Sequence, residues 1–423
     1  MAKTKLTQQS GYGWVIVAAA FTLSSMSFGV LASVGIFLKP LAAEFNWSRG
    51  SLSFGYSAIT FATAFSGLFW SYIVDRYGSR WVVLFGSVTL GIPLLLLSGM
   101  ETITEFFLYY FIFGALGHAT ITGPLYANVG IWFTKNVGLA IGLTVAGGAF
   151  GQGLIPYAVR YLIDQGNWQT AYSTIGLAYL ILATPIALLI RDSPRRKLVI
   201  TEAAPSQKDG TPFPLSTRIV VLWISFAVIF CCMAMAIPIV HLVPLLTDNG
   251  INPKNAVTVF LFLMLAGVVG RVLGGKLADH IGALQSYACM SILQTSVIFI
   301  FPHTQNIILI YILAIIFGIA FSGVMVSFLV SVRMMVPSRY LARSMATVSM
   351  SGWIGMGLGG WHGGYIFDLT GNYFWSYYSG SFAGIINLII LLLFYLHIEK
   401  TNRWKIQMRG SKAPQNEHHP SRF

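Results

Sequence analysis

Long apolar stretches recur along the whole of this 423-residue chain. A helix needs roughly 20 mainly apolar residues to cross a bilayer, and twelve segments meet that requirement. They are continuously apolar instead of alternating, which favours helices over barrel strands. We expect spans at 12–38, 50–74, 81–99, 104–131, 137–160, 170–190, 218–246, 255–278, 283–302, 305–331, 343–367 and 374–398. Ten or eleven spans are the alternative where segments abut. The predicted fold is an all-α membrane protein.

Composition agrees with that class. Hydrophobic residues make up 56% of the chain and charged residues only 9%, with a mean hydropathy of +0.71. An ordinary soluble domain carries about 25% charged residues. The net charge of +13 is scattered over loop clusters, so we do not expect a nucleic-acid partner; the expected surroundings are a lipid bilayer.

One long polar stretch, 191–217, divides the spans six and six. We therefore predict a six-helix bundle at 1–190, a cytoplasmic linker at 191–217, a second six-helix bundle at 218–398 and a cytoplasmic tail at 399–423. Comparison of the chain with itself supports a duplication with an offset near 204 residues. Asp75, Gly78 and Asp164 fall on Asp279, Gly282 and Asp368. Two pseudo-symmetric six-helix bundles are one plan of secondary transporters, whose substrate site lies between the halves.

Basic residues indicate the orientation. Twenty-one of the 26 Lys and Arg residues fall on one side if the N-terminus is cytoplasmic, and the other side holds Lys39, Arg49, Arg160 and Lys254. Cytoplasmic loops carry the excess of positive charge. We expect a multi-pass protein of the cell (inner) membrane with both termini in the cytoplasm.

Arg271 is the basic residue left over, because it lies inside the eighth span. An ion in hydrocarbon is costly and persists mainly where it faces a watery cavity or an ionic ligand. Guanidinium stays charged and offers a planar fork of donors that matches a carboxylate. The alternative is an arginine that extends its side chain to the cytoplasmic surface. Its partner in the repeat is Gly67.

Two loops resemble the signature of the major facilitator superfamily: DRYGSR after the second span and GGKLADHIG after the eighth. Gly78 and Gly282 suit tight turns, because glycine tolerates positive φ. An aspartate in such a loop can meet a helix N-terminus of the opposing half and stabilise one conformation. The expected conformational motif consists of Asp75, Arg76, Gly78, Arg80, Asp279 and Gly282.

Other stretches resemble the monocarboxylate transporter family. They are GYGWVIV at 11–17 and WFTKNVGLAIGLTVAGGAFG at 132–151, and HLVPLLTDNGI is similar to bacterial members near the oxalate/formate antiporter branch. The resemblance implies transport of a lactate- or pyruvate-like monocarboxylate by alternating access, coupled to protons. It also implies that Arg271 binds the carboxylate and that Lys39 takes part in substrate and proton uptake. An interfacial anchor is the alternative for Lys39.

Three more residues are candidates for the site. Tyr126 offers a hydroxyl to the substrate, although tyrosine is also common at membrane interfaces. His118, well inside the fourth span, is a candidate for substrate or proton binding, and His241 for a proton-linked role. A neutral histidine that is hydrogen-bonded to a neighbouring helix is the alternative for His118.

The chain departs from animal members of the family at Gly267, where they carry an acidic residue. All 13 acidic residues fall in loops, span ends or tails. The empty carrier is then cationic and the carrier with a bound monoanion is near neutral. We expect slow reorientation of the empty carrier, which favours exchange over net flux, unless a histidine carries the proton.

Other functions are less consistent with these residues. GMGLGG at 355–360 lies within a predicted span with no strand before it, so it indicates close helix packing and not a dinucleotide site. We expect no ATP, no cofactor, no metal and no catalytic residues, hence no enzyme. An anion exchanger of the oxalate/formate type and a non-transporting anion sensor remain the alternatives.

Overall fold

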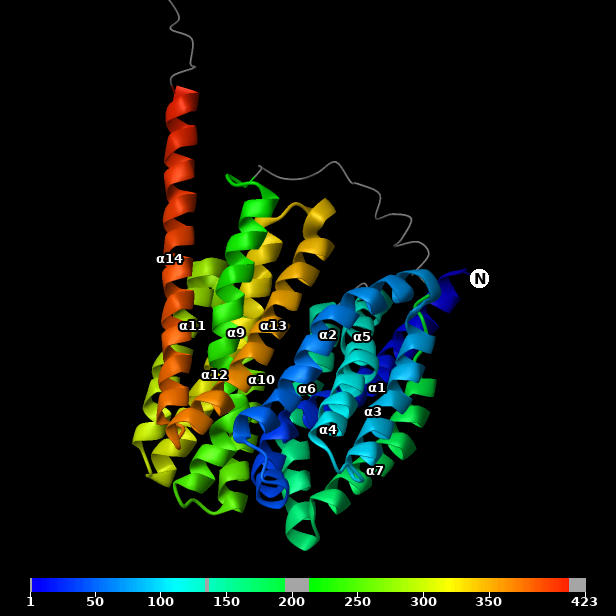
Figure 1. Cartoon of the computed structure of the whole chain (residues 1–423). Helices are drawn as coiled ribbons and strands as arrows, with labels where there is room; N and C mark the ends of the chain where they lie inside the picture. Colours follow the sequence, from blue (N-terminus) through cyan, green and yellow to red (C-terminus); the bar gives the residue numbers. More distant parts are fainter. Residues whose placement is uncertain (1, 134–136, 195–212, 411–423) are drawn as a thin grey trace, which may run out of the picture.

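The computed structural model describes residues 2–133, 137–194 and 213–410 (Figure 1). In this part of the chain, helices follow one another with short connections. Their bounds are α1 Ala2–Phe45, α2 Arg49–Tyr77, α3 Ser79–Leu97, α4 Ile103–Ile112, η1 Phe113–His118, α5 Ala119–Trp132, α6 Val137–Gln165, α7 Trp168–Leu188, α9 Thr217–Asp248, α10 Pro253–Ile281, α11 Ala283–Ile300, η2 Phe301–His303, α12 Ile307–Met335, α13 Ser338–Thr370 and α14 Phe374–Gly410.

The predicted spans coincide with these helices. Eleven helical segments of the described residues are long and apolar enough to cross a membrane, and α4, η1 and α5 join into one of them, Ile103–Trp132. The remaining predicted span, 343–367, lies in α13, which has 33 residues and is richer in Gly and Ser. The all-helical membrane fold is therefore confirmed. Helix α14 continues to Gly410, into the predicted tail. Most of the predicted linker (195–212) and the end of the tail (411–423) lie outside the described residues.

Glycines allow the closest helix contacts. In α6, a Cβ at Gly147 would lie 2.3 Å from the Phe21 carbonyl oxygen of α1, and one at Gly151 would lie 1.9 Å from that of Ser25. In GMGLGG, Gly355 and Gly359 bring α13 equally close to α9, because a Cβ at these positions would lie 2.3 and 2.1 Å from carbonyl oxygens of that helix. Bare backbones that touch in this way are typical of helix pairs in membranes. The interpretation of GMGLGG as a packing motif is thus confirmed.

Two further glycines end helices. Gly78 follows α2 with φ 98°, and Gly282 follows α10 with φ 96°. An L-residue with a side chain rarely adopts such a φ. Both loops therefore turn at the glycine that the sequence predicts.

The fourth span is not a regular α-helix. Its middle, η1, is a π-helical turn that ends at His118. A π-helical turn inserts an extra residue per turn and is frequent at functional sites. It changes the direction in which the following side chains leave the helix.

The helices form two groups, α1–α7 and α9–α14 (Figure 1). We call the face where α1 begins and α14 ends the terminal face. Helix α2 packs against α13 and α6 against α10, and these pairs join the groups. The start of α2 meets the end of α13, whereas the other ends of the two helices diverge toward the terminal face (Figure 1).

Candidate functional site

Charged residues join the two groups at the face opposite the terminal face. Asp248, at the end of α9, forms an ion pair with Lys39 of α1 at 2.8 Å and a second ion pair with Arg49 of α2. Lys39 also donates to the Thr247 hydroxyl at 3.2 Å. The side chains of Lys39 and Asp248 are 41% and 27% exposed, so solvent screens these pairs. Lys39 therefore lies in a contact between the two groups.

Asp368, near the end of α13, accepts hydrogen bonds from the backbone amides of Arg49 at 2.9 Å and Gly50 at 2.7 Å. These amides begin α2, so a carboxylate of the second group caps a helix of the first. The Arg49 guanidinium lies over the Phe367 ring, 3.9 Å from its centroid, and near Tyr373. Burial raises the pKa of the Tyr373 phenol, which keeps this ring neutral beside the cation.

From this cap, α2 and α13 stay in contact for about half of their length. Gly364 packs against Ser53, Gly360 against Tyr56 and Gly357 against Phe61. The Ser57 hydroxyl donates to the Gly357 carbonyl at 2.6 Å. Farther toward the terminal face, a Cβ at Gly67 would meet nothing within 4 Å. The two groups are therefore closed at the opposite face and separate along this pair of helices toward the terminal face.

Arg271 lies at the contact between α10 and α6, in the second and first group respectively. Its Nη1 donates a hydrogen bond to the Val145 carbonyl of α6. Its charge interacts with the Tyr126 hydroxyl of α5, which lies beside Ser24 of α1. Val145 is eight residues inside α6, about 12 Å from the helix end. The guanidinium is thus directed across to the other group and not along its own helix to the surface.

No carboxylate pairs with Arg271 among the residues that the structure describes. At Gly267, one turn earlier on α10, a Cβ would lie 2.5 Å from the Ser322 hydroxyl of α12, so a side chain there requires this hydroxyl to turn away. Arg271 itself is half-buried.

His118 lies between the two groups. Its Nδ1 is 2.6 Å from the Ser27 hydroxyl of α1, and its buried Nε2 has no hydrogen-bond partner. The imidazole contacts Phe28 edge-on and also Trp353 of α13, with ring centroids 4.7 and 5.2 Å apart. A ring of the second group therefore covers a titratable group of the first.

His241 has different surroundings. It is fully buried inside the second group, where its Nε2 is 2.8 Å from the Gly360 carbonyl of α13. Its ring lies 5.2 Å from that of Tyr373. The hydrogen-bond and ring partners of His241 are therefore residues of its own group.

The residues of the loop motif lie at the terminal face. Arg76 and Arg80 lie near the rings of their neighbours Tyr77 and Trp81. Asp75 and Asp279 are exposed. A further carboxylate caps a helix at this face: Asp192 accepts hydrogen bonds from the backbone amide and the hydroxyl of Ser79, at 2.6 Å each, at the start of α3.

Sequence reasoning missed Asp248, Asp368, Trp353 and Asp192 as participants. A signal existed for Asp368, which falls on Asp164 in the repeat. Asp164 pairs with Arg160 within α6, so the repeat alone does not predict the contact of Asp368 with α2.

Known proteins resemble this chain over nearly its whole length. The model of the Major Facilitator Superfamily matches residues 16–330 and, in a second match, 222–418. Monocarboxylate transporter 13 of Rattus norvegicus is 28% identical over 396 residues, which cover 91% of this chain and 90% of that protein. Monocarboxylate transporter 2 of the same species is 23% identical over 97% of this chain and 89% of that protein.

Solved structures share the fold. The xylose transporter XylE from E. coli, in a partially occluded inward open conformation, has a TM-score of 0.71 at 16% identity and covers 91% of this chain and 98% of its own. A bacterial homolog of the human lysosomal transporter Spinster, inward-facing and unoccupied, has a TM-score of 0.67 at 16% identity and covers 92% and 97%.

The family match spans most of the chain, and the helices cross a membrane many times. The function is therefore transport and not enzymatic catalysis. The chain belongs to the major facilitator superfamily of secondary transporters and is distantly related to monocarboxylate transporters.

Proposed function

We propose that this protein transports small monocarboxylates, such as lactate or pyruvate, by alternating access between its two groups of helices. Arg271 is the residue that binds the substrate carboxylate. The distant similarity to monocarboxylate transporters supports the substrate class.

One observation carries the proposal: Arg271 reaches from α10 toward Val145 and Tyr126 without a carboxylate partner among the described residues. A charged side chain at the centre of a membrane helix costs about 2.5–3.5 kcal/mol on insertion scales. A bound monoanion offsets this cost, because it neutralises the guanidinium and accepts its charge-assisted hydrogen bonds. The Tyr126 hydroxyl can donate to the same anion.

Two other predicted residues take roles around this centre. Lys39 attracts the anion at the opposite face when its ion pair with Asp248 opens. His118 accepts the coupled proton on Nε2, which has no partner and becomes accessible when Trp353 moves with the second group. We assign the terminal face to the cytoplasm from the excess of basic residues in its loops.

The lack of a carboxylate beside Arg271 also favours an exchange mode. The empty site carries a net positive charge, and reorientation moves this charge through the bilayer. While His118 stays neutral, the loaded site is neutral and reorients more easily, whereas a proton on His118 gives the loaded site the same charge as the empty one. An exchanger of the oxalate/formate type is the second candidate for this reason, although a dianion would leave a negative charge on the site.

The test uses the purified protein in proteoliposomes with labelled lactate. We expect counterflow into lactate-loaded vesicles to be faster than net uptake into empty ones, and net uptake to rise when the outside is acidic. Competition by C1–C6 monocarboxylates and by oxalate identifies the preferred acid. If these acids bind but are not taken up in either mode, the protein is an anion sensor and not a transporter.

A further inference from the structure

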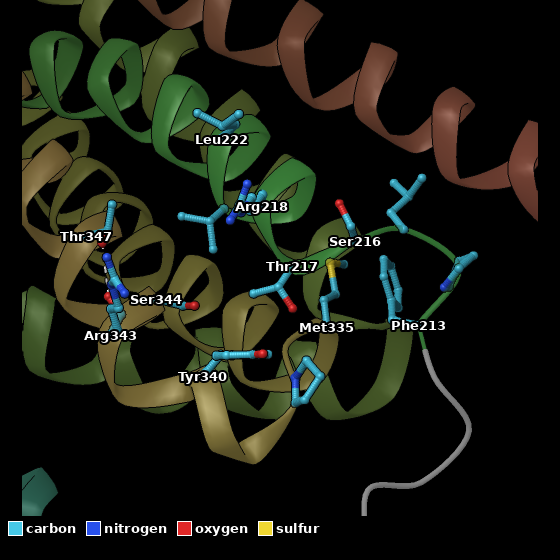
Figure 2. Close-up of a pocket in the computed structure, with 14 residues that line it drawn as sticks. Phe213, Ser216, Thr217, Arg218, Leu222, Met335, Tyr340, Arg343, Ser344 and Thr347 are labelled. Atoms are coloured by element: carbon cyan, nitrogen blue, oxygen red, sulfur yellow. Dashed lines mark hydrogen bonds between the residues drawn. The ribbon is translucent and has the colours of Figure 1, made fainter.

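A pocket of about 890 Å³ lies at the terminal face of the second group, away from Arg271. The start of α9, the end of α12 and the start of α13 form its walls (Figure 2). Its size lies within the range of about 300–1,000 Å³ that is typical of ligand sites. None of the residues assigned above to substrate or proton binding lines it.

The polar part of the lining is basic and rich in hydroxyls. Arg218 comes from α9 and Arg343 from α13, and both are exposed (Figure 2). Within the described residues, neither arginine forms an ion pair and no acidic residue lines the pocket. Ser216, Thr217 and Ser344 add hydroxyl groups. Two arginines from separate helices of one pocket favour an anion such as phosphate, because guanidinium groups bind its oxygens in pairs.

The start of α9 strengthens this preference for an anion. Ser216 is the N-cap residue, and its side chain makes no capping hydrogen bond. The first amides of α9 therefore have no side-chain acceptor from the cap and carry the positive end of the helix dipole. The uncapped start of α9 adds to the attraction for an anion, but the two arginines contribute its main part.

An apolar surface continues from the pocket along α9. Leu222, which lines the pocket one turn after Arg218, is 68% exposed, and Phe226, one turn farther, is 60% exposed. Residues four apart share one face of a helix. In a membrane protein, an exposed stripe of this kind contacts acyl chains. A ligand that fits both the basic pocket and the apolar surface of α9 has a phosphate head and a hydrocarbon tail.

We propose that this pocket binds the phosphate headgroup of an anionic phospholipid from the leaflet at the terminal face. Arg218 and Arg343 contact the phosphate, and the acyl chains lie along Leu222 and Phe226. The lipid then bridges the starts of α9 and α13. A water-soluble phosphate compound is the alternative ligand for the two arginines, but it has no hydrocarbon chain to contact Leu222 and Phe226.

The test measures retention of phosphatidylglycerol against phosphatidylcholine by the full-length protein, with native mass spectrometry. We expect Arg218→Gln and Arg343→Gln each to weaken phosphatidylglycerol binding about fivefold, since one arginine near an anionic surface contributes about 1 kcal/mol. Arg333→Gln is the matched control, because this exposed arginine ends α12 at the same face but does not line the pocket. The affinity of the Arg333→Gln variant for phosphatidylglycerol should change less than twofold.

Two further arms separate the possible outcomes. Leu222→Asn should weaken phosphatidylglycerol binding, and glycerol phosphate and inorganic phosphate should not compete at equal concentration. Effective competition by either compound would assign the pocket to a soluble ligand and overturn the proposal. Equal losses in the Arg333 variant, or no preference over phosphatidylcholine, would also overturn it. The thermal unfolding midpoint of each variant in phosphatidylcholine reports whether the fold is intact.

Discussion

The carboxylate of Asp368 accepts a hydrogen bond of 2.7 Å from the backbone amide of Gly50, across the boundary between the two groups. A helix of the first group is thereby capped by a side chain of the second. Opening of the opposite face would move Asp368 away from the start of α2 and break the cap. Asp368 therefore contributes to the conformational equilibrium itself, beyond the stability of either group.

We expect Asp368→Asn to increase the population that is open at the opposite face by about fivefold, because a carboxylate at a helix N-terminus contributes up to about 1 kcal/mol. Distances between spin labels at the exposed residues Glu101 and Lys254, one from each group, report this opening. Asp164→Asn is the matched control, since Asp164 pairs with Arg160 of its own helix. An unchanged distance distribution in the Asp368 variant would contradict the role of the cap.

Arg271→Lys retains the positive charge but loses the planar fork. Hydrogen bonds to charged groups contribute about 1.5–3 kcal/mol, so we expect the half-saturation concentration for lactate to rise by roughly 10- to 150-fold. Proteoliposome uptake measures it. Lys276→Gln, five residues farther along α10, removes a charge from the same helix and should leave uptake nearly unchanged. Wild-type kinetics in the Arg271 variant would exclude this arginine as the carboxylate ligand.

His118→Gln keeps a hydrogen-bonding side chain beside Ser27 but cannot carry a proton. Uptake by the unmodified protein should rise as the pH outside falls, because the proton that His118 binds is carried inward together with the anion. We expect the variant to lose this pH dependence. His241→Gln should keep it, since His241 is enclosed within the second group. The opposite result would transfer the proton-linked role to His241.

Gly151→Ala places a methyl group 1.9 Å from the Ser25 carbonyl oxygen. Because overpacking costs about 1–3 kcal/mol, the thermal unfolding midpoint in detergent should fall by several degrees. At Gly142 of the same helix, a Cβ meets nothing within 4 Å, and alanine is the better helix former by roughly 1 kcal/mol. Gly142→Ala should therefore be neutral or stabilising. Equal effects of the two changes would contradict the close α1–α6 contact.

The sequence was sufficient to predict the positions of the helices and the two turns at Gly78 and Gly282. Span lengths follow from bilayer thickness, and a glycine at a tight turn follows from backbone sterics. Arg271 also stood out, since an ion in an apolar stretch is conspicuous in any sequence.

The contact partners of the candidate site residues could not be predicted from the sequence. Whether Arg271 meets Val145 or a headgroup depends on how α10 packs against α6, which apolar composition does not encode. The covering of His118 by Trp353 depends on the π-helical turn η1, for which no local signal was recognised. The pairing of Asp248 with two cations likewise joins residues about 200 positions apart.

At the opposite face, α1 and α9 cross where Gly35 faces the Val240 carbonyl, and even a methyl group on Gly35 would lie 2.2 Å from that oxygen. A side chain can change its rotamer within nanoseconds, but two main chains separate only when a whole helix moves, which takes microseconds to milliseconds. Opening of the opposite face at this crossing therefore takes at least microseconds.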